Sequence, residues 1–246
     1  MTPGTLNSML SIGRSEAALE AAFPAPVEIR PMRNARRLRL RFDASTGSFK
    51  LTCPARMSRK AALAWALDQR EWVQRQLDSI VPPEPIAPGV LIPVEGRDTT
   101  IVWDESFRRT PQLALGELRC GGPETGLQRR VESFLKTMAL QTMSAEVAEF
   151  SKAAEVSASA VSIGDPATRW GSCSSQGRIR LSWRLILAPP EVRRYVVAHE
   201  VAHLKHLNHG PQFKALEARL VGPGVAEAKA VLRRVGPRLR RVGRGR

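Results

Sequence analysis

The chain has 246 residues, of which 43% are hydrophobic and 25% are charged, so it can fold around one substantial core or two small ones. This composition excludes an intrinsically disordered protein, and no stretch approaches the roughly 18 apolar residues that a membrane-spanning helix needs. The first thirty residues lack the basic start and apolar run of a signal peptide, and the three cysteines form no CxxC pair. We therefore expect a folded cytoplasmic protein with no membrane span.

Most of the net charge of +15 lies in two arginine-rich segments, from Arg30 to Arg41 and from Arg233 to Arg246, which hold six and seven arginines and no acidic residue. Such segments can bind an anionic partner, such as nucleic acid or an acidic surface. The alternative is that they are only solvated. Arg37 and Arg39 alternate with apolar residues, as on the outer face of a strand, and no aromatic residue lies among them to stack on bases.

The N-terminal part of the chain predicts a β-hairpin followed by a helix. Apolar and polar residues alternate over residues 36–53 on both sides of the turn signal DASTG, as in two paired strands. Ser58 then precedes an apolar stripe of helical period, which continues to Ile80. The proline-rich sequence VPPEPIAPG that follows indicates a linker. We expect residues 25–88 to form a subdomain of this kind.

The rest of the chain mixes short strands with longer helices, which indicates an α+β fold. Apolar residues recur at helical spacing from Leu127 to Ala145. The segments whose pattern indicates strands are 100–103, 112–118, 159–164 and 178–182. We expect a second folded region at 89–230, with a flexible N-terminus at 1–24 and a basic, frayed C-terminal tail at 231–246.

All four histidines lie in the sequence HEVAHLKHLNH, which begins at His199. On a helix His199 and His203 are four residues apart and project from the same face, so both imidazoles can bind one metal ion. Glu200 lies about 100° round the helix from His199, where a carboxylate can take a proton from a metal-activated water. The spacing therefore predicts a zinc site with Glu200 as the general base.

A catalytic zinc site needs a third protein ligand, and His209 is a better candidate than His206. His206 faces the same way as His199 but lies about 10.5 Å further along the helix axis, too far for a shared ion. His209 lies in the sequence NHGP, where Asn208 and the glycine tolerate left-handed geometry and Pro211 can begin the next helix. The chain can therefore turn back and bring His209 to the metal.

The sequence is also compatible with another third ligand, and its spacing matches that of another class of zinc protease. A downstream glutamate, Glu217 or Glu227, could supply the third ligand in place of His209. The spacing HExxHxxxxxH also occurs in metzincins, but these have glycine at the position of His206 and a methionine turn further on. Because the last methionine here is Met143, the metzincin interpretation fails, while the glutamate alternative stays open.

Four motifs surround and precede the histidines: RWGSC at 169–173, LSWRL at 181–185, YVVAHEVAHL at 195–204 and NHGPQF at 208–213. With them the chain resembles the YgjP-like metallopeptidase family, which is related to the SprT-like and Wss1-type zinc proteases. The resemblance implies a compact zincin-like core, with a small mixed or antiparallel sheet and HExxH on a helix, preceded by an N-terminal β-hairpin and helix. It also implies zinc on His199, His203 and His209, with Glu200 as the general base.

Three further residues of these motifs have weaker predicted roles. Arg169 could stabilise a developing oxyanion as a fixed cation, or it could brace its strand through a salt bridge. Tyr195, one turn before His199, could donate a hydrogen bond to an intermediate or simply pack in the core. Cys173 stands alone, which favours a buried structural thiol over a zinc ligand.

These patterns predict a zinc-dependent metallopeptidase that acts on a peptide or protein substrate and pairs it, in extended form, with an edge strand at 178–182. Two other functions are compatible with parts of the sequence. One is metal-dependent hydrolysis of nucleotide phosphoanhydrides, against which the chain shows no glycine-rich phosphate loop. The other is a nucleic-acid-associated module that uses the arginine-rich segments without catalysis.

Overall fold

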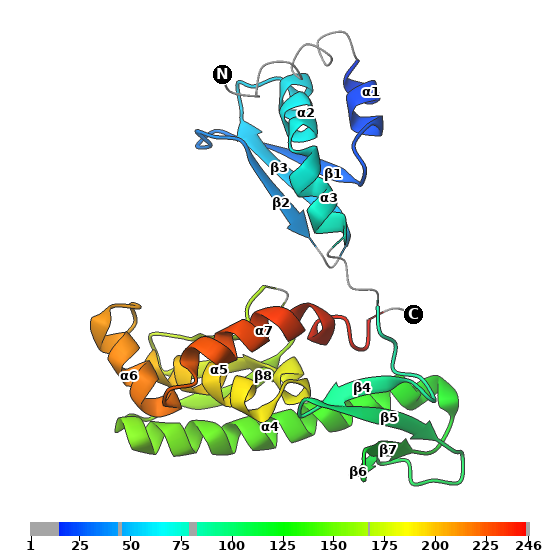
Figure 1. The fold of residues 1–246 in the computed structure, drawn as a ribbon, viewed down its shortest axis with the longest axis vertical. Coiled ribbons are helices and arrows are strands. Elements are labelled where there is room, and N and C mark those ends of the chain that lie inside the picture. Colours follow the sequence, from blue (N-terminus) through cyan, green and yellow to red (C-terminus); the bar gives the residue numbers. More distant parts are fainter. Residues whose placement is uncertain (1–14, 44–45, 79–82, 167, 245–246) are drawn as a thin grey trace. The chain divides into compact units, whose positions relative to one another are not determined.

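The computed structural model describes residues 15–43, 46–78, 83–166 and 168–244, and the chain falls into two compact units that divide between Ile80 and Val81 (Figure 1). Each unit has a hydrophobic core of its own. No helix in the described ranges is long and apolar enough to cross a membrane. Most of the expected flexible N-terminus, residues 1–14, lies outside the described residues.

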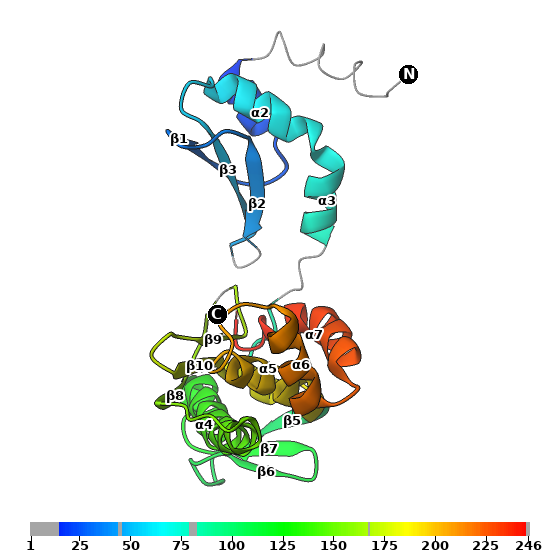
Figure 2. The same ribbon diagram turned by 90° about the vertical axis from the view of Figure 1, so that its left-hand side faces the viewer.

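The first unit is a three-stranded sheet with helices packed on one face (Figure 2). Its elements are α1 (Glu16–Ala21), β1 (Val27–Met32), β2 (Arg39–Asp43), β3 (Ser48–Pro54), α2 (Arg59–Asp68) and α3 (Arg70–Asp78). The central strand β3 pairs antiparallel with β2 and parallel with β1. The sequence predicts the pairing of β2 with β3 but not β1, because β1 buries only Ile29 and shows no clear alternation.

The core of the first unit follows from the alternation along β3, which buries Phe49, Leu51 and Cys53 on one face. Helix α2 begins after Ser58, whose Oγ accepts a hydrogen bond from the Ala61 backbone N–H at 3.2 Å. This is the predicted N-cap, and it satisfies one of the unpaired donors of the first turn. The predicted single helix is in fact two, α2 and α3, joined at one residue between them.

The second unit contains two small sheets and four α-helices in the described residues (Figure 1). Its elements are β4 (Leu91–Val94), β5 (Arg97–Trp103), β6 (Gln112–Ala114), β7 (Glu117–Cys120), the 3-10 helix η2 (Glu124–Gly126), α4 (Leu127–Ala154), β8 (Ala160–Gly164), β9 (Gly171–Cys173), β10 (Arg178–Ser182), the 3-10 helix η3 (Trp183–Leu187), α5 (Pro190–Ala202), α6 (Pro211–Val221) and α7 (Val225–Leu239). The strand orders are β4-β5-β7-β6 and β8-β10-β9.

Helix α4 forms the base on which the second unit is packed. Its apolar residues recur every four positions, and Val131, Leu135, Ala139, Met143 and Val147 are all buried in the core. This i, i+4 spacing gives one continuous apolar stripe, against which α5 packs. The helix extends nine residues beyond the predicted Ala145 and ends where Glu155 adopts a left-handed backbone with φ 55°.

The position of β10 corrects one prediction. The segment 178–182 was expected to be an edge strand that pairs with substrate, but β10 is the central strand of its sheet. It pairs parallel with β8 and antiparallel with β9, so both of its edges are occupied. Alternation along a sequence shows which face of a strand is buried, but it does not show which strands flank it. The edges of this sheet are β8 and β9.

The C-terminal segment is not the frayed tail that its arginine and glycine content predicts. Helix α7 continues to Leu239, and both Leu239 and Val242 are buried, with 2% and 0% of their surface exposed. The backbone of Gly243 donates to the carbonyl of Glu84, and Arg238 forms an ion pair with the Glu84 carboxylate at 2.7 Å. The segment is therefore docked on the start of the second unit as far as residue 244, the last one described.

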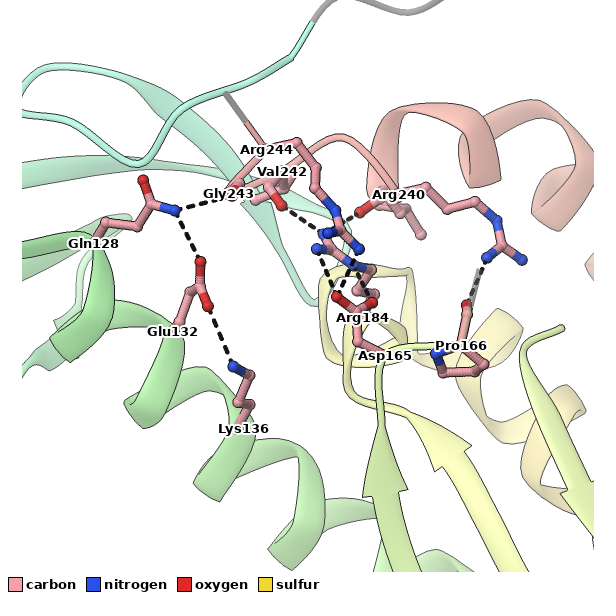
Figure 3. A network of polar contacts seen from close by, with 11 residues as sticks. Gln128, Glu132, Lys136, Asp165, Pro166, Arg184, Arg240, Val242, Gly243 and Arg244 are labelled. Carbon is pink, nitrogen blue, oxygen red and sulfur yellow. Dashed lines mark hydrogen bonds and ion pairs between the residues drawn. The ribbon is translucent and has the colours of Figure 1, made fainter. Parts of the chain in front are cut away.

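A buried guanidinium holds this C-terminal segment in place (Figure 3). Arg184, only 3% exposed, donates to the carbonyls of Leu239 and Val242 and forms an ion pair with Asp165 at 2.7 Å. Arg244 also pairs with Asp165, at 2.8 Å. The guanidinium thus satisfies the Leu239 carbonyl, which the end of α7 leaves without a helical partner, and the carbonyl of Val242 three residues further on.

Candidate active site

Helix α5 positions the first part of the predicted site. It begins at Pro190, with Glu191 in its first turn, and its apolar side, including Val197 and Val201, is fully buried. Proline at the first helical position and an acid in the first turn both favour a helix N-terminus. The helix carries His199 and ends at Ala202, and His203 is its C-cap with an αR backbone. Both imidazoles therefore come from one face of the last turn.

The return segment between α5 and α6 brings His209 back to the same point. The donor atoms of His199, His203 and His209 all lie within 4.8 Å of one another, and the Nε2 atoms of His199 and His209 are 3.2 Å apart. The turn does not use left-handed geometry as expected: Gly210 has φ −72°, and its N–H donates to the Asn208 carbonyl at 2.8 Å.

Hydrogen bonds on the far side of two imidazole rings leave their Nε2 atoms directed into the site. Nδ1 of His199 is 2.7 Å from the Glu217 carboxylate, and Nδ1 of His203 is 3.1 Å from the backbone carbonyl of His206. Both partners are acceptors, so each Nδ1 is the protonated nitrogen and each Nε2 keeps its lone pair. His206 therefore contacts the site through its carbonyl, not its imidazole.

Phe213 lies beneath all three imidazole rings. The distances from its ring centroid to those of His199, His203 and His209 are 5.0, 4.6 and 4.7 Å, and its side chain is 1% exposed. Phe213 is in the first turn of α6, which starts directly after the return segment. The sequence motif NHGPQF contains this residue, but nothing in the pattern indicates that it forms the floor of the site.

Glu200 is buried beside the histidines, with 6% of its surface exposed. Burial raises its pKa to about 7, and the positive charge of Arg169 acts in the opposite direction. Strand β9 closes tightly over this carboxylate: a Cβ added to Gly171 would lie 2.5 Å from Oε1 and 2.6 Å from Cγ of Glu200. Only a glycine leaves room for the glutamate in this position, so Gly171 is a site residue that the spacing argument misses.

The two alternative glutamate ligands lie elsewhere. Glu217 contacts Nδ1 of His199, the nitrogen on the opposite side of the ring from His209, and Glu227 is exposed on α7.

Tyr195 is buried, and burial together with the negative charges of Glu217 and Glu200 raises its pKa. Its hydroxyl also forms a hydrogen bond to Glu217. Tyr195 is thus directed to a carboxylate behind His199.

Arg169 is exposed just before β9, and Cys173 is at the other end of that strand. Cys173 is half-buried and not fully buried as expected, and burial together with the charge of Glu200 raises its pKa. It remains a neutral thiol under these influences. Among the described residues, the cluster of groups that could share one metal ion consists of the three histidines and does not include Cys173.

The three histidines could hold one metal ion between them, and a set of three protein ligands would leave a position for water or substrate. Ligand distances of about 2.0–2.1 Å to zinc require nitrogens roughly 3.3 Å apart, close to the 3.2 Å between the Nε2 atoms of His199 and His209. Two of the rings already carry the Nδ1 hydrogen bonds that metal-bound histidines usually make. Three imidazoles with a carboxylate next to the first of them in HExxH are the arrangement typical of metal-dependent hydrolases.

Comparison with known proteins agrees with this class. The model of the family described as YgjP-like, metallopeptidase domain matches residues 36–235, and the chain belongs to this family. The resemblance seen in the sequence motifs is thereby confirmed, and the matched residues extend over both units. Membership implies a metal ion and a peptide or protein substrate.

Among solved structures, the metallopeptidase zymogen of Pyrococcus abyssi abylysin is similar at 20% sequence identity. The match covers 41% of this chain and 97% of that chain, with a TM-score of 0.35. Comparison with curated proteins gives no match.

Proposed function

We propose that this protein is a zinc-dependent peptidase in which His199, His203 and His209 hold the metal and Glu200 is the general base. The observation that carries the proposal is the convergence of three imidazoles, with ligand atoms within 4.8 Å of one another. The residue after the first of them, Glu200, has a buried carboxylate that lies against Gly171 of β9. An all-imidazole donor set suits zinc better than calcium or magnesium, which prefer oxygen ligands.

We assign a separate role in peptide hydrolysis to the metal and to each residue beside it. When bound, zinc supplies Lewis acidity towards the substrate carbonyl and lowers the pKa of water at its open position. Glu200 takes a proton from the attacking water and delivers it to the leaving nitrogen. Arg169, whose charge acts on Glu200, is assigned to stabilise negative charge that develops on the carbonyl oxygen.

The edge of β9 supports an assignment for substrate binding. The Trp170 carbonyl accepts from Ser182 N–H at 2.8 Å, and Ser174 N–H donates to the Arg178 carbonyl at 2.9 Å, so these residues face β10. In an antiparallel ladder the direction of the backbone N–H and C=O groups alternates from one residue to the next, so the odd-numbered residues of β9 direct theirs away from β10. Gly171 and Cys173 therefore present main-chain groups at the open edge.

We assign this open edge of β9, and not β10, to the substrate. An extended peptide can add to it as a further strand through main-chain hydrogen bonds. Because Gly171 contacts Glu200, a peptide in this register has its backbone next to the proposed general base. The main chain provides most of these contacts, so we expect recognition of an unfolded or extended segment with modest dependence on its side chains.

The proposal is tested by measuring zinc content and turnover in the same preparations. Glu200→Gln should keep stoichiometric zinc and lose about 10²–10⁴-fold in kcat on a peptide library, because only the proton carrier is removed. His209→Ala should lose stoichiometric zinc. Full activity of zinc-loaded Glu200→Gln, or stoichiometric zinc in His209→Ala, would contradict the mechanism or the ligand set. Turnover of nucleoside triphosphates in place of peptides would replace the substrate class.

A further inference from the structure

The carboxylate behind His199 belongs to Glu217, which is buried in α6 with 4% of its surface exposed. One of its oxygens, Oε1, is 2.7 Å from Nδ1 of His199, and the other, Oε2, is 3.2 Å from the ammonium of Lys229 on α7. The Tyr195 hydroxyl also hydrogen-bonds to it. A buried carboxylate is strongly disfavoured unless it is paired and hydrogen-bonded, and these three partners meet that requirement.

This contact distinguishes His199 from the other histidines. Nδ1 of His199 faces an ionised carboxylate, whereas Nδ1 of His203 faces only the neutral carbonyl of His206. A carboxylate is the stronger acceptor, so it orients the ring more firmly and makes the opposite nitrogen more basic. That opposite nitrogen, Nε2, is the one that points towards His209.

Helix α6 provides the physical reason for this arrangement. It begins at Pro211, two residues after His209, and Phe213 in its first turn contacts the three imidazole rings. Glu217 is four residues after Phe213 and therefore lies on the same face of the helix, one turn further on. One helix thus follows the third histidine, supplies the apolar floor and carries the carboxylate behind the first histidine.

We propose that Glu217, held by Lys229 and Tyr195, is a positioning residue that fixes the ring and tautomer of His199 and thereby sets the affinity of the site for its metal. This inference rests on the proposed function in that His199 is a metal ligand. It replaces the alternative in which Glu217 is itself a ligand, because its carboxylate contacts the nitrogen of His199 that faces away from the other donors.

The test is the dissociation constant for zinc, measured by competition with a chromophoric chelator, for the full-length protein and its variants. Glu217→Ala should bind zinc about 10–100-fold more weakly than the wild type. Glu217→Gln keeps an acceptor oxygen without the charge, so its affinity for zinc should lie between those of the wild type and Glu217→Ala. The matched control is Glu132→Ala. Glu132 on α4 also pairs with a lysine at 3.2 Å and hydrogen-bonds an amide, but it has no contact with the histidines.

A second measurement separates positioning from general stability. In ¹⁵N NMR spectra of the metal-free protein, His199 should be protonated at Nδ1 in the wild type, should keep only part of this preference in Glu217→Gln and should lose it in Glu217→Ala. A zinc affinity of Glu217→Ala within twofold of the wild type, or an unchanged His199 tautomer in both variants, would overturn the inference. If Glu217→Ala fails to fold, the affinity and tautomer of Glu217→Gln decide.

The two proposals can fail separately. A wild-type protein that binds zinc through His199, loses affinity on substitution of Glu217 and cleaves no peptide would retain the positioning role while the peptidase proposal fails. Peptide cleavage with zinc affinity that does not depend on Glu217 would leave the peptidase proposal intact and remove the positioning role.

Discussion

The contact between Gly171 and Glu200 provides the sharpest prediction. Gly171 lies in extended β9 with no left-handed backbone requirement, so alanine is compatible with its conformation and only the space is lacking. The added Cβ would lie 2.5 Å from Oε1 and 2.6 Å from Cγ of Glu200, whereas ordinary contacts begin at about 3.4 Å. Relief of this overlap requires a displacement of about 0.9 Å, shared between the strand and the glutamate side chain.

A displacement of this size is large for a catalytic group. Misplacement by about 1 Å can cost on the order of 10²-fold in rate, so Gly171→Ala should lower kcat by about that factor. Overpacking should also lower the free energy of unfolding by roughly 1–3 kcal/mol, which leaves the protein folded at room temperature. The three atoms nearest to the added Cβ all belong to Glu200 and none to a histidine, so zinc binding should remain stoichiometric.

The assay is steady-state cleavage of a peptide substrate by the zinc-loaded variant, with thermal unfolding and zinc content measured on the same samples. Gly224→Ala is the matched control, because Gly224 precedes α7, has φ −82°, and a Cβ there meets no atom within 4 Å. Wild-type kcat in a folded, zinc-loaded Gly171→Ala protein would refute the reasoning, since the proposed base would then tolerate a displacement that it should not.

Two further predictions concern residues outside the proposed ligand set. His206→Ala should keep stoichiometric zinc and nearly full activity, because the site uses the carbonyl of this residue to hold His203 and not its imidazole; loss of zinc would show that the ring is a ligand. For Asp165, burial opposes ionisation, but Arg184 and Arg244 together lower its pKa below 3.8. Its ion pairs therefore stabilise the folded protein above about pH 3.8, and this stability is lost as the pH falls through the lowered pKa. Asp165→Asn should cost roughly 2–3 kcal/mol at pH 7 by chemical denaturation and little at pH 2, and an equal loss at both pH values would contradict the ion-pair explanation.

The proposed metal ligands could be identified from the sequence because helix geometry is local. The four-residue separation of His199 and His203 fixes their common face, and the rise per residue excludes His206, so neither step depends on the rest of the fold. The choice of His209 depends only on a short turn before Pro211. The structure brings these three histidines together, although Gly210 adopts an extended backbone and neither Asn208 nor Gly210 has the expected left-handed one.

The features that the sequence did not reveal depend on contacts between distant segments. The sequence pattern predicts for Glu217 only a charged position on an amphipathic helix. Its contact with His199 arises when α6 packs against α5. Gly171 is important because β9 lies against Glu200, 29 positions later in the chain. The exchange of β10 for β9 as the edge strand has the same cause, since strand order is set by the whole sheet and not by the pattern within one strand.

The docked C-terminal segment changes how the arginine-rich sequence should be interpreted. Arg240 lies over the ring of Trp170 at 4.1 Å. It also donates to the Pro166 carbonyl at 3.1 Å, while Arg244 pairs with Asp165 (Figure 3). All three contacts hold the segment that leads into β9, the strand that closes over Glu200. Arginines of the C-terminal segment therefore hold in place the residues that precede β9, the strand whose edge is assigned to substrate. Arg238 and Arg244 are paired with acidic residues and Arg240 is stacked on an aromatic ring, so the net charge of this segment overstates what it can offer to an anionic partner.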